Sequence, residues 1–482
     1  MEQFTNQFIN GQWKKGSSEK TIQNSNPYND DLLLTIQCAN ADDLDEAYKA
    51  ARRVQEEWES TALLEKRALF DQLLEKMKDN KDMIIDWLIK EAGSTRLKAD
   101  IEFALAVAVV KESASFLTRT TGVILPSQIP GKENRVYRAA KGVVGIIGPW
   151  NFPFHLTIRS LAPALATGNT AVIKPASDTP VTSGLMIGKL FQDAGFPDGT
   201  VNVIVGRGGE VGDQFVEHPI PKIISFTGST EVGKGIGEIA GKNLKEIALE
   251  LGGNNVMLVL KDANIDRAAK AAAFGKFLHQ GQICMALNRI IVDASIHDEF
   301  VDAFLKIVKN LQAGDPSDPK TFVGPLINSG QVERIQNQIE ESVNQGAYVA
   351  LEGKAEGTLM HPVVLTGVTP DMPIAKNEIF GPVAPILKAA TEEEAVEMAN
   401  ASIYGLSGSI FTEDRHRGVQ IAKKIDTGMI HINDQPVNDE PHVPFGGEKA
   451  SGVGRFNGEW AIEKFTTVKW ISVQDGYREY PI

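Results

Sequence analysis

Apolar positions early in the chain recur at spacings of three and four residues. Leu44, Ala47, Ala51, Val54 and Trp58 follow this spacing, which places them on one face of an amphipathic helix. The same spacing continues in a second set of positions, Leu69, Leu73, Met77, Ile84 and Leu88. The forty residues that precede this region are mostly polar and carry turn signals. The pattern therefore predicts a polar entry followed by several helices.

Short continuous apolar runs replace the helical spacing from residue 142 onward. The runs cover residues 143–147, 170–174, 201–205, 222–226 and 246–251. Helix-like segments separate them, at 155–167, 181–194, 210–217 and 231–243. Strands that are buried on both faces appear as continuous apolar runs, and alternation with helices indicates parallel pairing. The pattern predicts an α/β fold with a Rossmann-type, doubly wound nucleotide-binding domain.

The same reading divides the chain into three parts. We predict a nucleotide-binding domain from residues 1–121 and 141–251. A second strand–helix series begins near residue 254 and predicts an α/β catalytic domain over 252–448. Residues 122–140 and 466–482 look like extended excursions from these domains. We expect the two excursions to pair as a small β oligomerisation arm.

Composition and charge narrow the possible functions. The chain has 482 residues, of which 42% are hydrophobic and 23% charged, as in folded proteins of two or three domains. A net charge of −13 argues against nucleic acid as a partner. The longest apolar run, 103–110, is too short to span a bilayer, and the N-terminus lacks a secretory signal. We expect a soluble cytoplasmic protein without a membrane partner.

The chain has only two cysteines, Cys38 and Cys284, which excludes a disulfide framework. A metal site is not expected either, because there is no C-x-x-C motif and Cys38 lies far away in a polar segment. His279 precedes Cys284 by five residues, a poor distance for two side chains to face each other on a helix. We therefore interpret His279 as a packing or surface residue.

Three segments carry groups suited to thioester chemistry. Cys284 lies in the sequence GQICMA, Glu250 in LELGGN and Asn151 in PWNFP. A thiol can attack a carbonyl, an amide can stabilise the resulting oxyanion, and a carboxylate can activate water. Each residue alone has an ordinary alternative, as a buried cysteine, a solvated strand-end glutamate and a turn asparagine.

Together these segments resemble the NAD(P)-dependent aldehyde dehydrogenase family, and the resemblance extends over nearly the whole chain. It implies that Cys284 attacks an aldehyde, that Asn151 holds the oxyanion, and that Glu250 activates the water that hydrolyses the thioester. Two alternatives remain. A CoA-acylating dehydrogenase does not need Glu250, and a non-catalytic structural or binding protein on the same fold needs none of the three.

A glycine-rich sequence, GSTEVGKG, begins at Gly228. It fits the start of an ATP-binding phosphate loop, but Gly235 stands where the Mg²⁺-binding hydroxyl belongs, so an ATPase is disfavoured. A glycine-opened helix start can still bind a pyrophosphate through its backbone N–H groups. The resemblance implies cofactor contacts at Phe226, Gly228, Ser229 and Gly233.

Other cofactor residues follow from the resemblance alone. It places Lys174 at the adenosine ribose, where a glutamate three residues later often holds the ribose hydroxyls. Here that position is Ser177, which can donate to a 2′-phosphate, so the cofactor is NAD or NADP. The sequence EIFGP places Glu378 and Phe380 at the nicotinamide ribose and ring. Trp150 is assigned to the same cofactor site.

Softer signals concern the substrate. The stretch 430–435, the sequence PFGG at 444–447 and the Ile158-Arg159 pair resemble the aromatic branch of the family, the benzaldehyde and vanillin dehydrogenases. This resemblance implies a small aromatic aldehyde as the substrate, with Phe152 and Arg159 at the substrate pocket. It also implies a homodimer or a dimer of dimers.

Overall fold

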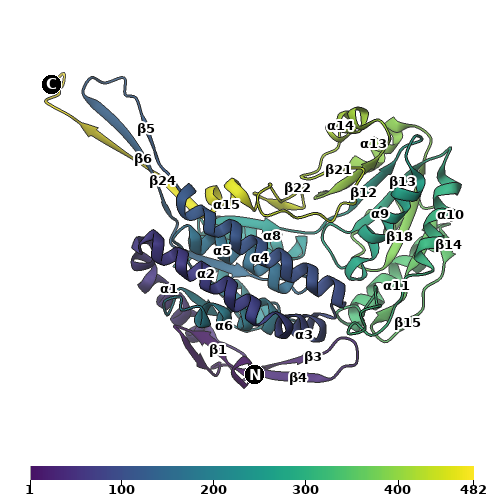
Figure 1. Ribbon diagram of the computed structural model, residues 1–482, viewed down its shortest axis with the longest axis horizontal. Helices are drawn as coiled ribbons and strands as arrows, with labels where there is room; N and C mark the ends of the chain where they lie inside the picture. The colour runs from purple at the N-terminus through teal and green to yellow at the C-terminus, as the bar shows by residue number, and fades with distance from the viewer. Residues whose placement is uncertain (1) are drawn as a thin grey trace.

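Two large sheets, each with its own helices, organise the computed structural model, which describes residues 2–482 (Figure 1). A narrow β arm projects from the half that contains the first sheet, and the C-terminus lies at its tip (Figure 1). The fold is α/β, as the alternating pattern predicts, and both large sheets are mixed because they carry antiparallel pairs at their edges.

The first sheet has eight strands in the order β2-β1-β9-β8-β7-β10-β11-β23. Its five central strands are parallel: β7 (Val143–Ile147), β8 (Thr170–Lys174), β9 (Val201–Val203), β10 (Ile223–Thr227) and β11 (Glu246–Glu250). Each lies within two residues of its predicted run. The edge strands β1 (Gln7–Ile9), β2 (Gln12–Lys14) and β23 (Gly452–Val453) are antiparallel. Strands β1 and β2 were not predicted from the sequence, because they lie in the mostly polar first forty residues.

Helices of the N-terminal half pack around this sheet. They are α1 (Ala41–Ser60), α2 (Leu63–Asp79), α3 (Lys81–Ala92), α4 (Arg96–Arg119), α5 (Pro153–Ala166), α6 (Met186–Asp193), α7 (Asp213–Glu217) and α8 (Thr230–Lys242). The apolar face predicted for α1 is its buried face. Its Trp58 is 1% exposed and donates the indole N–H to the Leu165 carbonyl of α5 at 3.1 Å, so the ring gains burial without losing its hydrogen bond.

The second sheet has seven strands in the order β14-β17-β18-β13-β12-β20-β21, all parallel except the β14–β17 pair. The strands are β12 (Asn255–Val259), β13 (Leu287–Asp293), β14 (Tyr348–Leu351), β17 (Val363–Thr366), β18 (Val383–Ala389), β20 (Gly408–Phe411) and β21 (His431–Ile432). The helices are α9 (Ile265–Phe277), α10 (His297–Val308), α11 (Ser329–Asn344), α12 (Pro373–Lys376), α13 (Glu392–Asn400) and α14 (Arg415–Ala422).

The arm is a three-stranded antiparallel sheet of β5 (Val123–Leu125), β6 (Lys132–Ala140) and β24 (Thr466–Gln474). Strand β24 pairs with β6 along its full length, from Thr466 opposite Ala140 to Gln474 opposite Lys132. The predicted pairing of the two excursions is therefore confirmed. Large apolar side chains remain exposed on the arm: Val123, Ile124, Leu125, Val468, Trp470, Ile471 and Val473.

The chain returns to the first sheet near its C-terminal end. After β21 it crosses back, adds β23 beside β11 with Gly452 opposite Glu250, and forms α15 (Gly458–Phe465). This return brings residues from the end of the chain to the carboxyl end of β11. Smaller hairpins complete the structure: β3 (Thr21–Ser25) with β4 (Leu32–Gln37), β15 (Ala355–Glu356) with β16 (Leu359–Met360), and β19 (Tyr404–Gly405) with β22 (Glu448–Lys449).

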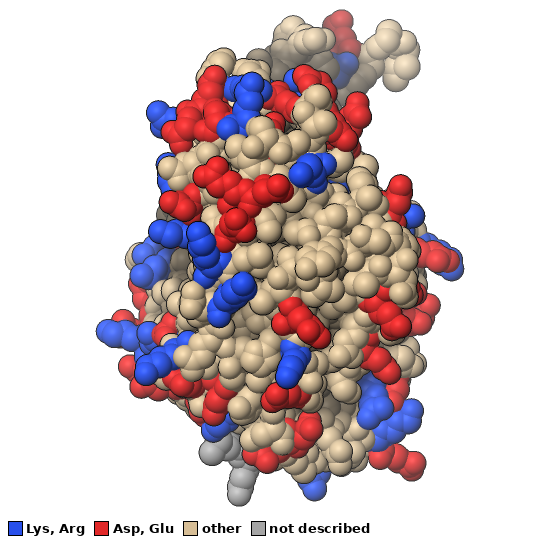
Figure 2. Space-filling model, turned by 90° about the vertical axis from the view of Figure 1, so that its right-hand side faces the viewer, with Lys and Arg blue, Asp and Glu red and all other residues tan. Residues whose placement is uncertain are grey.

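Acidic and basic side chains are interspersed on the face that Figure 2 shows, with an uncharged region between them. Within residues 2–482, no helix combines the length and apolarity needed to cross a membrane.

Candidate active site

Cys284 lies in a tight turn between a short 3-10 helix (Leu278–Gly281) and β13. The Ala286 N–H donates to the Ile283 carbonyl at 2.9 Å and closes the turn. The side chain of Asn255, the first residue of β12, donates to the carbonyls of Cys284 and Ala286 at 2.7 and 2.8 Å. Cys284 therefore lies on a loop held by the second sheet, and the sequence did not single out Asn255 as the residue that holds it.

The two glycines after Glu250 are explained by close approach. A Cβ atom at Gly253 would lie 2.3 Å from the Cys284 carbonyl oxygen, and one at Gly252 would lie 2.5 Å from Oε2 of Glu378. At Gly253 the backbone oxygen leaves room for glycine alone, and at Gly252 a larger residue would push the Glu378 carboxylate out of place. The LELGGN segment thus brings the end of β11 against both the cysteine loop and a candidate cofactor residue.

Glu250 is the last residue of β11 and is 1% exposed. Its Oε2 accepts a hydrogen bond from Nη2 of Arg159 at 2.6 Å, whereas Oε1 has no hydrogen-bond partner within the described residues. Burial raises the pKa of Glu250 to about 7, and the positive charge of Arg159 acts in the opposite direction. A carboxylate with this pKa can take a proton from water near neutral pH.

Arg159, on α5, is also 1% exposed and shares its charge between two carboxylates. Its Nη1 lies 3.3 Å from Asp439, which in turn lies 3.0 Å from Nε2 of His155. Burial opposes ionisation of Asp439, but the His155 hydrogen bond and the Arg159 charge lower its pKa to about 2. The guanidinium carbon lies 4.2 Å from the ring centroid of Phe445, a cation–π contact.

The substrate role predicted for Arg159 stays a prediction, and the structure shows other contacts for this side chain. Its side chain is not among the residues that line the cavity beside Cys284, and its partners are the carboxylates of Glu250 and Asp439. The other predicted substrate residue, Phe152, does line that cavity. His155 and Asp439 also lie there, and no local motif marks either residue in the sequence.

Asn151 precedes α5 and is 5% exposed. Its Nδ2 donates to the carbonyl of Gln282, two residues before Cys284, at 3.0 Å. A carboxamide has two N–H groups, so one donor remains for an oxygen bound near the thiol. The structure thus brings the predicted oxyanion donor to the cysteine loop.

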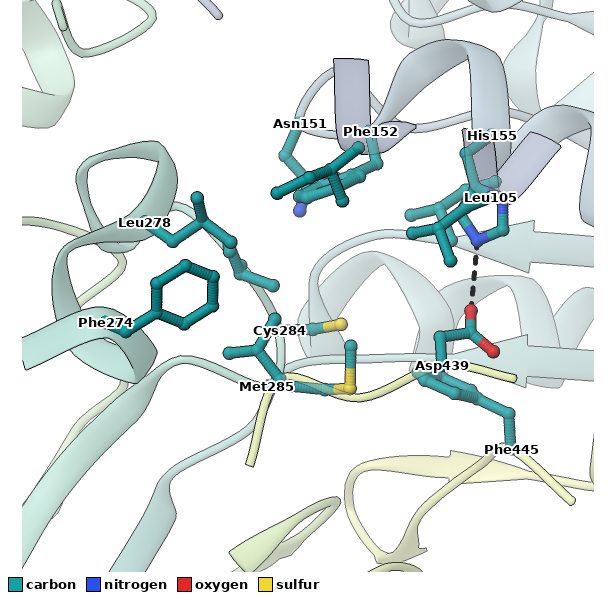
Figure 3. A pocket seen from close by; sticks show the side chains of 14 residues that line it. Leu105, Asn151, Phe152, His155, Phe274, Leu278, Cys284, Met285, Asp439 and Phe445 are labelled. Atoms are coloured by element: carbon teal, nitrogen blue, oxygen red, sulfur yellow. Dashed lines mark hydrogen bonds and ion pairs between the residues drawn. The ribbon is translucent and has the colours of Figure 1, made fainter. Parts of the chain in front are cut away.

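Asn151 and Cys284 face one cavity (Figure 3). Apart from these two residues and the His155–Asp439 pair, its walls are apolar: Ile101, Leu105, Phe152, Leu156, Phe274, Leu278, Ile283, Met285, Val437 and Phe445. Figure 3 shows Phe274 and Leu278 on one side of Cys284, and His155 and Asp439 on the other.

The same apolar surroundings affect the Cys284 thiol. Burial raises the pKa of the Cys284 thiol well above its usual value, the charge of Glu250 adds to this effect, and Arg159 opposes it. The resting thiol is therefore protonated at neutral pH. It requires a proton acceptor before it can attack, since the thiolate is the reactive form.

His279 packs in the core of the site. It is fully buried and meets the Phe152 ring edge-to-face, with 5.7 Å between the ring centroids. Burial lowers its pKa well below the usual value. It is a packing residue, one of the two roles expected for it.

The predicted pyrophosphate segment lies at the N-terminus of α8. Ser229 is the N-cap, and its Oγ accepts from the Val232 N–H at 3.4 Å. Gly228 lies directly over the ring of Phe226, where a Cβ atom would approach to 2.4 Å. Gly233 is buried within α8 and packs on Leu251, where a Cβ atom would approach to 2.3 Å. This packing accounts for the glycine, so its cofactor contact remains a prediction.

Lys174 ends β8, next to β7 in the sheet, and Ser177 follows it on a partly exposed turn. Burial lowers the pKa of Lys174 to about 8. These residues and the start of α8 lie beyond the carboxyl ends of parallel strands, where nucleotides bind in open α/β sheets.

Glu378 belongs to the part of the chain that forms the second sheet, on the segment between α12 and β18. Its Oε1 accepts from the Gly253 N–H at 2.9 Å, and burial raises its pKa to about 7. Arg334 holds the segment through the carbonyls of Glu378 and Ile379, at 3.0 and 2.6 Å. Phe380 meets Trp150 edge-to-face, with 5.4 Å between the ring centroids. Lys174 at the end of β8, Ser229 after β10 and Glu378 near Cys284 are thus polar groups spread along one path. This arrangement fits an extended dinucleotide.

Among residues 2–482, no three His, Cys, Asp or Glu side chains are placed to hold a metal ion.

Comparison with known proteins agrees with this geometry. The model of the aldehyde dehydrogenase family matches residues 13–471. A vanillin dehydrogenase of Corynebacterium glutamicum is 54% identical over 472 residues, 98% of each chain. The crystal structure of an NAD-dependent benzaldehyde dehydrogenase from that species has a TM-score of 0.91 at 50% identity, covering 98% of this chain and 97% of the other. A salicylaldehyde dehydrogenase from Pseudomonas putida G7, complexed with salicylaldehyde, has a TM-score of 0.96 at 33% identity, covering 99% of each. The chain belongs to the aldehyde dehydrogenase family.

The Arg159–Glu250 pair predicts a specific pH dependence. Glu250 acts as a base only when ionised, so kcat should fall as the pH drops through about 7. In Arg159→Met the carboxylate loses its cation, its pKa rises, and the acid limb of the kcat–pH profile should move up by at least about one unit. Arg159→Lys, which keeps the charge, should move it less. An unchanged acid limb in a folded Arg159→Met protein would show that the pair does not set the pKa of the base.

Proposed function

We propose that this protein oxidises aromatic aldehydes to carboxylic acids with NAD or NADP. Cys284 is the nucleophile, Asn151 the oxyanion donor and Glu250 the base. The observation that carries the proposal is the convergence of Cys284 and Asn151 on one apolar cavity, with the charge of the buried Glu250 acting on the thiol. The names of the similar proteins support it, since they describe dehydrogenases of vanillin, benzaldehyde and salicylaldehyde.

The cavity walls favour a flat apolar substrate. The rings of Phe152, Phe274 and Phe445 and several aliphatic side chains surround the thiol. An aromatic ring gains free energy by leaving water for such walls, roughly 25 cal/mol per Å² of apolar surface. Asn151 and Cys284 then meet the carbonyl, the one polar end of a simple aromatic aldehyde.

The first chemical step belongs to Cys284. Its thiol gives its proton to a water molecule, and the thiolate adds to the aldehyde carbon to give a thiohemiacetal. The carbonyl oxygen becomes an oxyanion, which the Asn151 carboxamide and the Cys284 backbone N–H can stabilise together. A single preorganised donor of this kind is worth about 10²–10³ in rate.

A nicotinamide cofactor, when bound, supplies the hydride acceptor that turns the thiohemiacetal into a thioester. The residues proposed to hold it are Phe226, Gly228 and Ser229 at the start of α8, Lys174 and Ser177 near the ribose, and Trp150, Glu378 and Phe380 near the nicotinamide; Gly233 supports α8 behind them. Because Ser177 is neutral, a 2′-phosphate would meet no carboxylate at that position.

Glu250 completes the reaction. It takes a proton from water, and the hydroxide attacks the thioester and releases the acid. Its unpartnered Oε1 is free to accept a hydrogen bond from that water. This requirement separates the proposal from the two alternatives. A CoA-acylating enzyme would release its acyl group to a thiol and not need the base, and a non-catalytic protein would need neither Glu250 nor Cys284.

We also propose a nucleotide-binding domain of residues 1–121 and 141–251 and a catalytic domain of 252–448. The arm of 122–140 and 466–482 would join subunits as a homodimer or a dimer of dimers. Its exposed apolar side chains support this, since large apolar patches commonly mark interfaces.

The double variant Val468→Asp/Trp470→Asp places two charges on the exposed face of the arm. Its sedimentation coefficient should shift towards that of the monomer. An assembly of unchanged size would reject the arm as the interface.

Replacing the base should separate the two halves of the reaction. Glu250→Gln should form up to one equivalent of reduced cofactor per active site with benzaldehyde and NAD, without coenzyme A, and then stall. Cys284→Ser should give neither burst nor turnover, because a hydroxyl is a far weaker nucleophile than a thiolate. Rapid-mixing absorbance measures both.

Glu246→Gln is the matched control, because it removes an exposed glutamate from the same strand and should behave as the parent. A normal steady rate in Glu250→Gln would remove Glu250 from the role of base. Turnover of the parent that depends on coenzyme A would favour the acylating alternative.

Ser177→Glu should cost NADP more than NAD. A carboxylate near the 2′-phosphate repels it, and solvent reduces the effect to about 1–2 kcal/mol, or roughly ten- to thirty-fold in affinity. The measurement is kcat/KM for both cofactors at one ionic strength. Ser177→Gln controls for side-chain size and should leave the ratio near that of the parent. If the NADP-to-NAD ratio does not fall in Ser177→Glu, residue 177 is not beside the ribose.

A further inference from the structure

A fully buried ion pair lies beneath the segment that carries Asn151. Lys98 and Glu102, one turn apart on α4, are both 0% exposed and 2.5 Å apart. Lys98 Nζ also donates to Ser94 Oγ at 3.0 Å and to the Asn151 carbonyl at 2.7 Å. An ammonium has three N–H donors, so all of them are used. One of them fixes the backbone of the proposed oxyanion donor.

Glu102 holds the next part of the same segment. Its Oε1 accepts from the backbone N–H groups of Phe154 and His155, at 2.9 and 3.1 Å. These belong to the first turn of α5, whose N-cap Phe152 supplies no side-chain hydrogen bond. The Glu102 carboxylate therefore caps the N-terminus of α5 from α4. Its negative charge is also stabilised by the positive end of the α5 dipole.

The pair also contacts the wall of the cavity. Lys98 Nζ lies 4.3 Å from the ring centroid of Phe152, over its face. Residues 151–155 are therefore held at Asn151, Phe152, Phe154 and His155, and three of these four line the cavity beside Cys284. The pair itself is not among the lining residues, so any effect on the reaction passes through that segment.

A buried ion pair contributes little to the free energy of folding, because apolar residues of similar volume often give equal or greater stability. The hydrogen bonds of Lys98 and Glu102, however, fix the position of each group they reach. The Asn151 backbone is fixed by Lys98, and its carboxamide is fixed by the carbonyl of Gln282 on the cysteine loop. The two anchors together set the direction of the remaining amide N–H.

We propose that Lys98 and Glu102 form a positioning pair for the oxyanion donor: they hold Asn151 in register with Cys284 without touching the substrate. The inference rests on the proposed function, since it requires an oxyanion to form at Cys284. Misplacing a catalytic group by about 1 Å can cost about a hundredfold in rate. Loss of the pair should therefore lower the rate of the first turnover rather than the binding of cofactor.

The test is the double variant Lys98→Met/Glu102→Gln, which removes both charges together and leaves no buried charge unpaired. The rate of the first cofactor-reduction burst, with saturating benzaldehyde and NAD, should fall about tenfold to a hundredfold. The dissociation constant for NAD should stay within about twofold of the parent. Glu91→Gln is the matched control: Glu91 is a buried carboxylate of α3 that accepts from the Val181 and Thr182 N–H groups, away from the cavity. It should leave the burst rate unchanged.

A double-mutant cycle with Asn151→Ala separates positioning from general damage. If the pair acts through Asn151, the double variant should lower the burst rate of Asn151→Ala by less than about threefold. An undiminished loss in that background, or an unchanged burst rate in the double variant itself, would overturn the proposal.

If the double variant does not fold, Glu102→Asp provides the same test, because its shortened side chain weakens the hold on α5. It should give a smaller loss that also disappears in the Asn151→Ala background. The rate of the parent tests the proposed function separately: a parent that oxidises no aldehyde refutes that function, whereas the ratios between variants test the positioning role.

Discussion

The buried ion pair between Arg159 and Glu250 is the interaction on which the site depends. A carboxylate with 1% of its surface exposed would be held neutral by burial alone. Arg159, 2.6 Å away, offsets that effect and keeps the pKa of Glu250 at about 7. The arginine must itself be stabilised, which Asp439 and the ring of Phe445 provide. Truncating one partner of such a pair typically costs about 3–5 kcal/mol.

The three charged groups of this site come from three different parts of the chain. Glu250 ends a strand of the first sheet, Arg159 lies on a helix of the same half, and Asp439 comes from the segment that returns from the second sheet. Two carboxylates with the same chemistry acquire different roles from their surroundings. Asp439, with more hydrogen-bond donors, has a pKa of about 2 and stays ionised, while Glu250, with a pKa of about 7, can exchange a proton.

The sequence predicted the parallel core and drew attention to three residues that the structure brings together, because each has a local signal. Buried strands appear as apolar runs, and Cys284, Glu250 and Asn151 lie beside glycines or prolines in short motifs. Strands β1 and β2 were missed because each has only three residues, too few for a pattern to stand out in a polar segment. The contacts of Arg159 with Glu250 and Asp439 were not predicted, because these partners lie 91 and 280 residues away along the chain.

The supporting groups were missed for the same reason. Asn255, Lys98 and Glu102 hold the site through contacts 29 to 53 residues away along the chain. Such contacts exist only in the folded state, so spacing along the sequence cannot reveal them. A lysine and a glutamate four residues apart on a helix ordinarily indicate an exposed pair, whereas this pair is fully buried.

The central claim is that an acyl group passes through Cys284 and leaves by the action of Glu250. Mass spectrometry of Glu250→Gln, quenched after mixing with benzaldehyde and NAD, tests it directly. We expect a benzoyl group on the peptide that contains Cys284, at close to one per chain, and little of it in the parent at steady state. An unmodified Cys284 peptide in a variant that has reduced its cofactor, or an acyl group on another residue, would contradict the account.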